Sequence, residues 1–329
     1  MEPNRGTELC FPHLFNASCT KTVRPYFTSI LIYIVLSCIA LFTTALNLLV
    51  IISISHYKQL QTPTNLLLLS LAVSDFFVGL LMSFQIAFID GCWYLSDLTC
   101  IITYVLDYII TSASIGTMVL ISIDRYVAIC DPLHYSTKVS PKRVKLCVFL
   151  CWLCSVLSHS SRLKDNLEEP GRYNSCIGEC VVVINYVAGI VDLILSFLGP
   201  FTVIIFLYMR VFVVVVSQVR AMRSHVASVK VQGSLRGIIK KSELKAARTL
   251  GVVVLVFLIC VCPYFFVIIT GQDTLLSPSS AAFVIYLFYF NSCLNPVIYT
   301  YFYPWLRKCL RLIFSLQILQ PGSSQISIL

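Results

Sequence analysis

Three acidic side chains lie in otherwise apolar stretches of the sequence, and they are the residues best suited to carry out chemistry. They are Asp75, Asp107 and Asp192. A carboxylate is costly to bury in apolar surroundings unless a cation or several hydrogen bonds compensate it, so such a residue indicates a function by default. The chemistry open to these residues is acid–base catalysis or the binding of a metal ion or an organic ammonium group.

Asp107 is the strongest candidate for an ammonium anchor. It lies seven residues after Cys100, which is about 10 Å along a helix. Thr111, Ser114 and Met118 follow at helical spacing and share its face. No Lys or Arg lies in the outer half of any apolar stretch, so an alkylammonium ligand would supply the missing cation. The alternative is a protonated Asp107 that is hydrogen-bonded within the protein.

Asp192 supplies a second carboxylate. It lies eight residues before Pro200, in a run of Val, Ile and Leu. We expect it to face the same pocket as Asp107 from the opposite wall, and two acids across one cavity favour a ligand with two positive ends. The alternative is that Asp192 points at a loop or at water near the end of its helix.

The elements that position these acids must lie in a membrane. Of the 329 residues, 58% are hydrophobic and only 12% are charged, whereas soluble domains carry about 25% charged residues. A helix needs about 20 mostly apolar residues to cross the hydrocarbon core. The sequence predicts an all-α membrane protein with seven spanning helices: Tyr26–Ser55, Asn65–Phe88, Leu98–Cys130, Val144–Ser158, Val181–Val216, Lys245–Ile269 and Ser279–Tyr301. The fourth is short and turns polar early, which indicates either an irregular outer end or a weakly constrained copy of the fold.

The distribution of Lys and Arg predicts the topology. With the N-terminus outside, six of the 24 Lys and Arg lie outside and the other 18 inside. This matches the positive-inside rule for a multi-pass membrane protein, and we expect the plasma membrane as its location. The net charge of +9 then indicates a basic cytosolic surface and not a binding site for nucleic acid. We expect an extracellular tail over residues 1–25, a seven-helix domain over 26–303, and a cytoplasmic amphipathic helix and tail over 304–329.

The expected outer segments carry their own chemistry. Asn16-Ala17-Ser18 is a glycosylation acceptor, unless the tripeptide is a chance match. The sequence alone leaves every pairing open among six outer cysteines, which are Cys10, Cys19, Cys92, Cys100, Cys176 and Cys180. On the inner side, the basic amphipathic run from Trp305 to Phe314 predicts an interfacial helix, in which Cys309 is either palmitoylated or a free thiol.

Several short motifs occur together in one order. They are Asn47, Leu71-Ala72-Val73-Ser74-Asp75, Asp124-Arg125-Tyr126, Trp152, Pro200, Pro263 and Asn295-Pro296-Val297-Ile298-Tyr299. In this combination the chain resembles rhodopsin-like G-protein-coupled receptors from about residue 26 to 315. Three further segments look like trace-amine-associated receptors: 58–65, 291–296 and 302–308. That family consists mostly of olfactory receptors for volatile amines, coupled to stimulatory G proteins and cyclic AMP.

The resemblance implies roles for the outer half of the chain. It implies a Cys100–Cys180 disulfide and a second bond from Cys176, with Cys19 favoured over Cys10. It makes Asp107 the amine anchor, and Asp192 points to a cadaverine-like or putrescine-like diamine, with a monoamine as the alternative ligand. The implied aromatic lining of the pocket is Tyr264, Phe265, Tyr286 and Tyr289, of which Tyr289 also bonds Asp107.

The resemblance also implies an inner switch region. A Na⁺ site is expected at Asp75 with Ser114, Asn291, Ser292 and Asn295, and the alternative there is a water-filled polar network. No other cofactor is expected. The residues expected to couple to a heterotrimeric G protein are Asp124, Arg125, Tyr126, Tyr208, Glu243 and Tyr299, and the packing triad between ligand and G protein is Ile115, Pro200 and Phe257.

One departure and two other classes of protein bear on this interpretation. Val261 stands where the family usually has tryptophan, which should deepen the cavity. An enzyme is disfavoured because no zinc motif, no nucleophile with a base and no Gly-x-Gly-Asp motif is present. A transporter is disfavoured because the two halves show no repeat.

Overall fold

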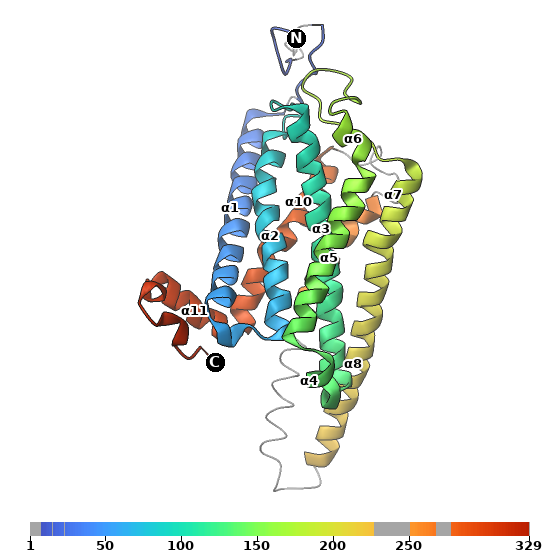
Figure 1. Ribbon diagram of the computed structural model, residues 1–329. Helices are drawn as coiled ribbons and strands as arrows, with labels where there is room; N and C mark the ends of the chain where they lie inside the picture. The colour runs from blue at the N-terminus through green and yellow to red at the C-terminus, as the bar shows by residue number, and fades with distance from the viewer. Residues whose placement is uncertain (1–7, 15, 23, 227–250, 268–277, 329) are drawn as a thin grey trace.

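The structure is a computed structural model that describes residues 8–14, 16–22, 24–226, 251–267 and 278–328. The described residues form a bundle of long helices (Figure 1). Six are long and apolar enough to cross a membrane: α1 (Tyr26–His56), α2 (Pro63–Ala87), α3 (Asp97–Cys130), α5 (Pro141–Arg162), the segment Tyr186–Ser217 and the segment Phe283–Phe302 of α10. A shorter apolar helix, Gly251–Val267, completes a bundle of seven among the described residues, as the sequence predicts.

Short elements join and end these helices. Between them lie the 3-10 turns η1 (Lys58–Leu60) and η2 (Pro132–His134) and the helices α4 (Tyr135–Lys138) and α6 (Lys164–Glu168). After α10 (Pro278–Phe302) comes α11 (Pro304–Phe314), followed by the turns η5 (Gln317–Leu319) and η6 (Ser323–Gln325). Figure 1 shows α11 projecting sideways beside one end of α1. The predicted helix after the last span is therefore present.

Local sequence explains where three long helices begin. Thr62, Ser96 and Ser140 each accept a backbone hydrogen bond three residues ahead, and proline follows at the first helical position of α2 and α5. A hydroxyl cap satisfies an otherwise unpaired N–H, and proline costs nothing there because its missing N–H is not needed.

Of the two interpretations of the short fourth span, the prediction of an irregular outer end is wrong. The sequence predicts this span as Val144–Ser158, but α5 runs as one helix from Pro141 to Arg162. The polar residues after Ser158 do not break it, because their side chains can face the interior of the bundle while the backbone stays hydrogen-bonded. His159 and Arg162 therefore lie on a helix and not in a loop.

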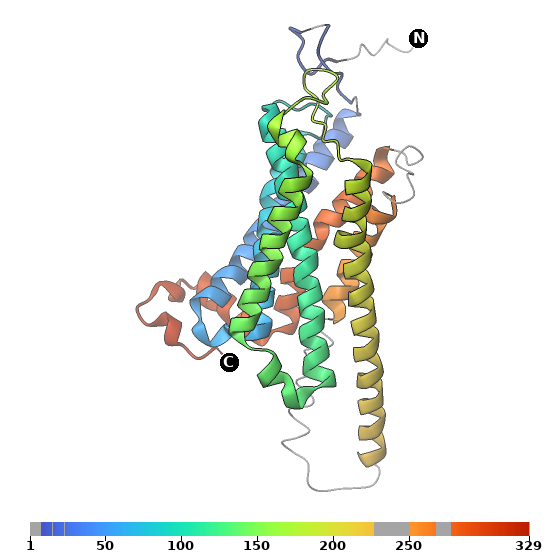
Figure 2. The same ribbon diagram turned by 45° about the vertical axis from the view of Figure 1, so that its right-hand side comes forward.

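The segment that carries Asp192 changes its helical pitch at that residue. The helix α7 (Tyr186–Asp192) passes into a π-helical stretch, η3 (Leu193–Leu198), and then into α8 (Gly199–Val226). A π-turn adds a residue to one turn and changes the direction of the side chains around it, which is why such turns recur at functional sites. Figure 2 shows α8 extending beyond its neighbours at the end of the bundle opposite the N-terminus.

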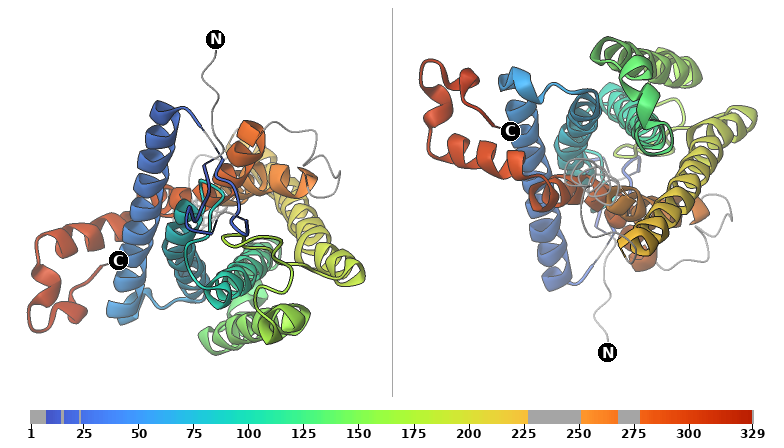
Figure 3. Two further views of the ribbon diagram at one scale, coloured as in Figure 1. Left: turned by 90° about the horizontal axis from the view of Figure 1, so that it is seen from above. Right: turned by 90° about the horizontal axis from the view of Figure 1, so that it is seen from below.

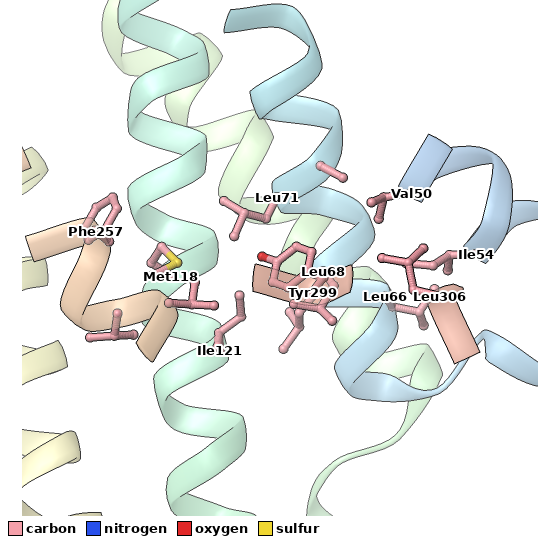
Figure 4. Packing of buried hydrophobic residues seen from close by; sticks show 14 of the residues in the cluster. Val50, Ile54, Leu66, Leu68, Leu71, Met118, Ile121, Phe257, Tyr299 and Leu306 are labelled. Atoms are coloured by element: carbon pink, nitrogen blue, oxygen red, sulfur yellow. The ribbon is translucent and has the colours of Figure 1, made fainter. Parts of the chain in front are cut away.

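The main hydrophobic core lies at the end of the bundle next to α11. Figure 4 shows Met118 and Ile121 of α3 near Leu68 and Leu71 of α2, with Tyr299 of α10 among them. Cys309 is fully buried in this cluster, so its side chain is not presented for acylation. Large apolar side chains are exposed on the outer faces of the long helices, as expected for surfaces that contact lipid.

The other end of the bundle is fastened by disulfides, and we call it the disulfide end. The structure contains Cys100–Cys180 and Cys19–Cys176, the two pairs that the resemblance favoured. A third bond, Cys10–Cys92, was not foreseen. Figure 3 shows the described N-terminal segment crossing this end of the bundle. The two N-terminal bonds thus tie that segment to the connections after α2 and α6.

Candidate functional site: a cavity lined by two acids

A cavity of about 340 Å³ opens between α3, α5, α7, the helix Gly251–Val267 and α10. Its lining contains both Asp107 and Asp192, which come from different walls. Apolar and aromatic side chains make up most of the rest, with a few polar groups such as Gln85, Thr111 and Ser196. A mostly apolar pocket of this size with a few charged groups is typical of a site for a small organic molecule.

Asp107 has no cation beside it among the described residues. It lies on α3, and the hydroxyl of Tyr289 donates a hydrogen bond of 3.4 Å to its Oδ2. Its Oδ1 is buried and has no hydrogen-bond partner among the described residues. A buried carboxylate oxygen without a donor is unfavourable, and an ammonium group would remove that cost.

Asp192 differs from the expectation. The structure places it in the cavity lining but pairs it with Arg162, whose Nη1 donates to Asp192 Oδ1. The Ser196 hydroxyl donates to the same oxygen at 2.7 Å. The premise that no basic residue reaches the outer half of the bundle is therefore wrong, because α5 extends far enough to bring Arg162 into it.

Two polar residues of α5 were missed because the span was ended too early. His159 is 3% exposed, lines the cavity and stacks on Tyr108 with ring centroids 5.7 Å apart. Its Nε2 has no hydrogen-bond partner among the described residues. The signal was the spacing of Ser155, His159 and Arg162, four and three residues apart, which places all three on one helix face.

The aromatic residues divide into those that line the cavity and one that does not. Tyr264, Phe265 and Tyr289 belong to the lining, together with Tyr104 and Tyr108, which the sequence interpretation missed. Phe265 stacks on Phe197 of η3 at 4.0 Å between ring centroids. Tyr286 is not among the lining residues and packs instead against a cluster formed mainly by α1 and α2. Tyr104 lies three residues before Asp107 on α3, and Tyr108 lies four residues after Tyr104, so helical spacing could have found them.

Val261, which was expected to deepen the cavity, is not among its lining residues. Val261 is buried and lines a separate hollow of about 20 Å³ below the cavity, with Phe257 and Phe288 among its neighbours. Phe197, Phe201 and Phe265 pack against one another, and Phe265 is the one of the three that lines the cavity.

A polar network surrounds Asp75 beneath that hollow. Asn295 donates from Nδ2 to Asp75 Oδ2 at 2.8 Å, and Asn47 donates to the carbonyl of Ser292 at 3.0 Å. The buried Oδ1 atoms of Asp75, Asn291 and Asn295 have no hydrogen-bond partner among the described residues. Ser114, Asn291 and Ser292 line the small hollow next to them. A set of unpaired oxygen atoms fits a hard cation, which coordinates oxygen.

The end of the bundle opposite the disulfides holds the Asp124-Arg125 pair. Arg125 donates from Nε to Asp124 Oδ2 at 3.0 Å, and Thr64 donates to the same oxygen. Tyr135 of α4 donates to Asp124 Oδ1 at 2.8 Å. Burial, together with the negative charge of Asp124, raises the pKa of Tyr135 to about 12, so its hydroxyl remains a donor.

Other residues expected to act at this end are partly placed by the structure. The hydroxyls of Tyr208 and Tyr299 are buried and lack hydrogen-bond partners among the described residues. Tyr126 packs against a small cluster of Ile129 and Val211. Of the packing triad, Ile115 and Phe257 share the main core, and Pro200 lines a hollow beside Ile115. Glu243 lies outside the described residues.

Comparison with known proteins agrees with this geometry. The profile of the 7 transmembrane receptor (rhodopsin family) matches residues 46–299. Trace amine-associated receptor 13c of Danio rerio is 36% identical, over 98% of this chain and 96% of its own length. Trace amine-associated receptor 8a of Rattus norvegicus is 35% identical with the same coverage, and Trace amine-associated receptor 1 of Homo sapiens is 35% identical over 95% of this chain and 96% of its own length.

The chain is therefore a rhodopsin-family, seven-transmembrane G-protein-coupled receptor. Within that family it belongs to the trace-amine-associated receptors, which bind amines and signal through heterotrimeric G proteins. It is a receptor and not an enzyme.

Proposed function

We propose that this receptor recognises a linear diamine and signals through a stimulatory G protein to cyclic AMP, as expected of an olfactory member of the family. The observation that carries the proposal is the presence of Asp107 and Asp192 in the lining of one cavity. The family supports the amine and the G protein, while the diamine and the cyclic AMP pathway are our inference.

The first ammonium group would bind at Asp107. Its Oδ1 lacks a donor, and the Tyr289 hydroxyl holds the other oxygen of the carboxylate. A charge-assisted hydrogen bond from an ammonium satisfies this oxygen. Tyr264 and Phe265 lie in the same lining and offer aromatic faces to the cation or to the methylene chain.

The second ammonium group would bind at Asp192. Arg162 and Ser196 both contact Oδ1, and the described residues provide no hydrogen bond to Oδ2. That oxygen is free to accept from a ligand. Because Asp192 lines the cavity from another wall, a diamine of suitable length reaches both acids at once.

One observation favours a second candidate, a monoamine. Arg162 neutralises Asp192, so the two acids and the guanidinium together carry one net negative charge. A single ammonium at Asp107 balances that charge, whereas a diamine brings one positive charge too many unless Arg162 moves or stays partly solvated.

The test compares a linear diamine with the monoamine of equal chain length, using cyclic AMP as the readout, on the wild-type receptor and on Asp192→Ala. We expect the wild type to respond more strongly to the diamine and the variant to lose that preference, because an ammonium stranded in an apolar wall is unfavourable. Asp165→Asn, an exposed acid on α6, is the control. A wild-type receptor with equal or greater potency for the monoamine would replace the diamine by the second candidate, and a response that persists in cells without the stimulatory α subunit would overturn the pathway.

The proposal includes an orientation in the plasma membrane. The bias of Lys and Arg supports an extracellular N-terminus, which would place the cavity mouth and the disulfide end outside the cell. Asn16 lies exposed at that end and would be open to glycosylation. Arg125 and the Tyr208 and Tyr299 hydroxyls would then lie at the G-protein side, where opening of the bundle would free Arg125 from Asp124. The role of Glu243 as a further partner of Arg125 remains a sequence prediction.

We also propose that Na⁺ binds at Asp75 and stabilises the inactive receptor. The residues that would hold the ion are Asp75, Ser114, Asn291, Ser292 and Asn295, and the unpaired oxygens among them support this. Bound Na⁺ would compensate the buried carboxylate charge. Replacing external choline by Na⁺ should lower agonist potency in the wild type but not in Asp75→Asn at matched expression. Equal sodium dependence in both receptors would leave a water-filled network as the better description.

A further inference from the structure

The second acid of the cavity already has a cation supplied by the chain itself. Arg162 is the last residue of α5, and Asp192 is the last residue of α7. Their side chains are 15% and 21% exposed, so the ion pair is mostly withdrawn from solvent. A charge pair in such a setting interacts more strongly than a surface pair, because less water screens it.

The guanidinium and the ligand approach Asp192 from different spaces. Asp192 and Ser196 line the amine cavity, whereas Arg162 does not. Arg162 lines a neighbouring hollow of about 270 Å³ between α3, α5 and η3, and Ser158 and Ser196 line it too. The carboxylate therefore stands between a tethered cation on one side and the ligand space on the other.

We propose that Arg162 is a specificity-determining residue whose guanidinium competes with the second ammonium of a ligand for Asp192. The proposal rests on the amine site put forward above and adds the device that sets its preference between monoamines and diamines. When Arg162 holds Asp192, the cavity favours a single positive charge. When Arg162 withdraws, the cavity favours two.

The contact is of a kind that a ligand can replace. Arg162 donates one hydrogen bond to one carboxylate oxygen of Asp192, Oδ1, and does not form the two-oxygen clamp that makes Arg–carboxylate pairs strongest. A long arginine at the end of a helix can swing its charged head toward the nearer water boundary while its stem stays in apolar surroundings.

The expected size of the competition follows from the fraction of receptors with an available Asp192. If Arg162 occupies the acid nine times in ten, the apparent diamine affinity falls about tenfold, because only the free fraction binds. The affinity of a monoamine that uses Asp107 alone is not reduced in this way. The diamine-to-monoamine potency ratio therefore reports the competition directly.

The experiment measures that ratio in cyclic AMP assays with a linear diamine and the monoamine of equal chain length. Arg162→Gln should raise the ratio about tenfold over the wild type. Arg162→Lys keeps a cation and should stay near the wild-type ratio. Lys164→Gln removes an exposed cation two residues further along and is the matched control, with no change expected. Arg162→Met is a second neutral variant in case Arg162→Gln does not reach the cell surface.

The alternatives give different results. If Arg162 only clamps α5 to α7, both neutral variants should lose potency for the two ligands equally, and an unchanged ratio would overturn the proposal. The double variant Arg162→Gln with Asp192→Ala should show the ratio of Asp192→Ala alone, since no second anchor is left to compete for; a raised ratio there also overturns it.

Failure of this inference is separable from failure of the proposed diamine ligand. A wild type that prefers monoamines, with an Arg162→Gln variant that prefers diamines, supports the competition and rejects the diamine as the wild-type ligand. A wild type that prefers diamines, with an unchanged ratio in Arg162→Gln, rejects the competition alone. Loss of response to every amine in all surface-expressed receptors rejects both.

Discussion

The α3 wall and the α7 wall of the cavity each present one aspartate to the same space, but in opposite electrostatic states. Asp107 on α3 has a tyrosine hydroxyl at 3.4 Å and an unpaired, buried Oδ1. Asp192 on α7 has a guanidinium and a serine hydroxyl on one oxygen. Asp107 has no cation beside it among the described residues, so a ligand can supply one. Asp192 already has the cation of Arg162.

The difference shows that an acid in an apolar run does not identify a ligand site by itself. What counts is whether the rest of the chain supplies a counter-charge, and that depends on where neighbouring helices end. A helix one turn longer moves a basic residue about 5 Å along its axis, which is enough to change a loop residue into a buried partner. Under the proposed function, Asp107 is therefore the amine anchor, and Asp192 adjusts the preference between ligands.

The largest expected effect comes from removing the unpartnered acid. Asp107→Ala should abolish or strongly weaken the response to monoamines and diamines alike, because both place an ammonium there. Loss of one partner of a buried charge pair costs about 2–5 kcal/mol, which shifts potency by about 30- to 4,000-fold. Cyclic AMP dose–response curves at matched surface expression measure the shift.

The contrast between the two acids would be contradicted if Asp107→Ala kept wild-type potency for any amine while Asp192→Ala lost potency. The two walls would then exchange roles, and the second acid would be the anchor despite its ion pair. Asp165→Asn serves as the control for loss of an exposed acid near the same end of the bundle.

Hydropathy predicted most of the fold because a membrane constrains helices so strongly. The predicted limits of α1, α2, α3 and α10 lie within about two residues of those observed, since only a helix satisfies its own backbone in lipid. The limit of α5 was wrong because hydropathy registers polar side chains without showing which way they face. His159 and Arg162 make the end of the helix less apolar, yet they line cavities inside the bundle.

The site was predictable to the extent that it depends on one helix at a time. Asp107 with its own helix face could be found by spacing, and the resemblance added Tyr289 across the bundle. The Arg162–Asp192 pair could not be found this way, because it depends on the relative depth of two helices and on the π-turn after Asp192. Tyr286 shows the same limit, since its side chain packs against a cluster that includes residues of α1 and α2 and does not line the cavity.

The smallest expected effect sharpens the comparison at the Asp107 wall. Tyr289→Phe removes the hydroxyl that donates to Asp107 Oδ2, and a typical intramolecular hydrogen bond contributes about 0.5–1.5 kcal/mol. At 3.4 Å the bond is long, so we expect the lower end of that range, a loss of potency of about two- to threefold. Monoamines and diamines should lose equally, because both depend on Asp107, and the ratio between them should stay constant. Tyr286→Phe on the same helix is the matched control and should change neither potency nor ratio, since Tyr286 does not line the cavity. If Tyr289→Phe lost potency for diamines alone, this hydroxyl would contribute to binding of the second ammonium group. The two walls would then not act independently.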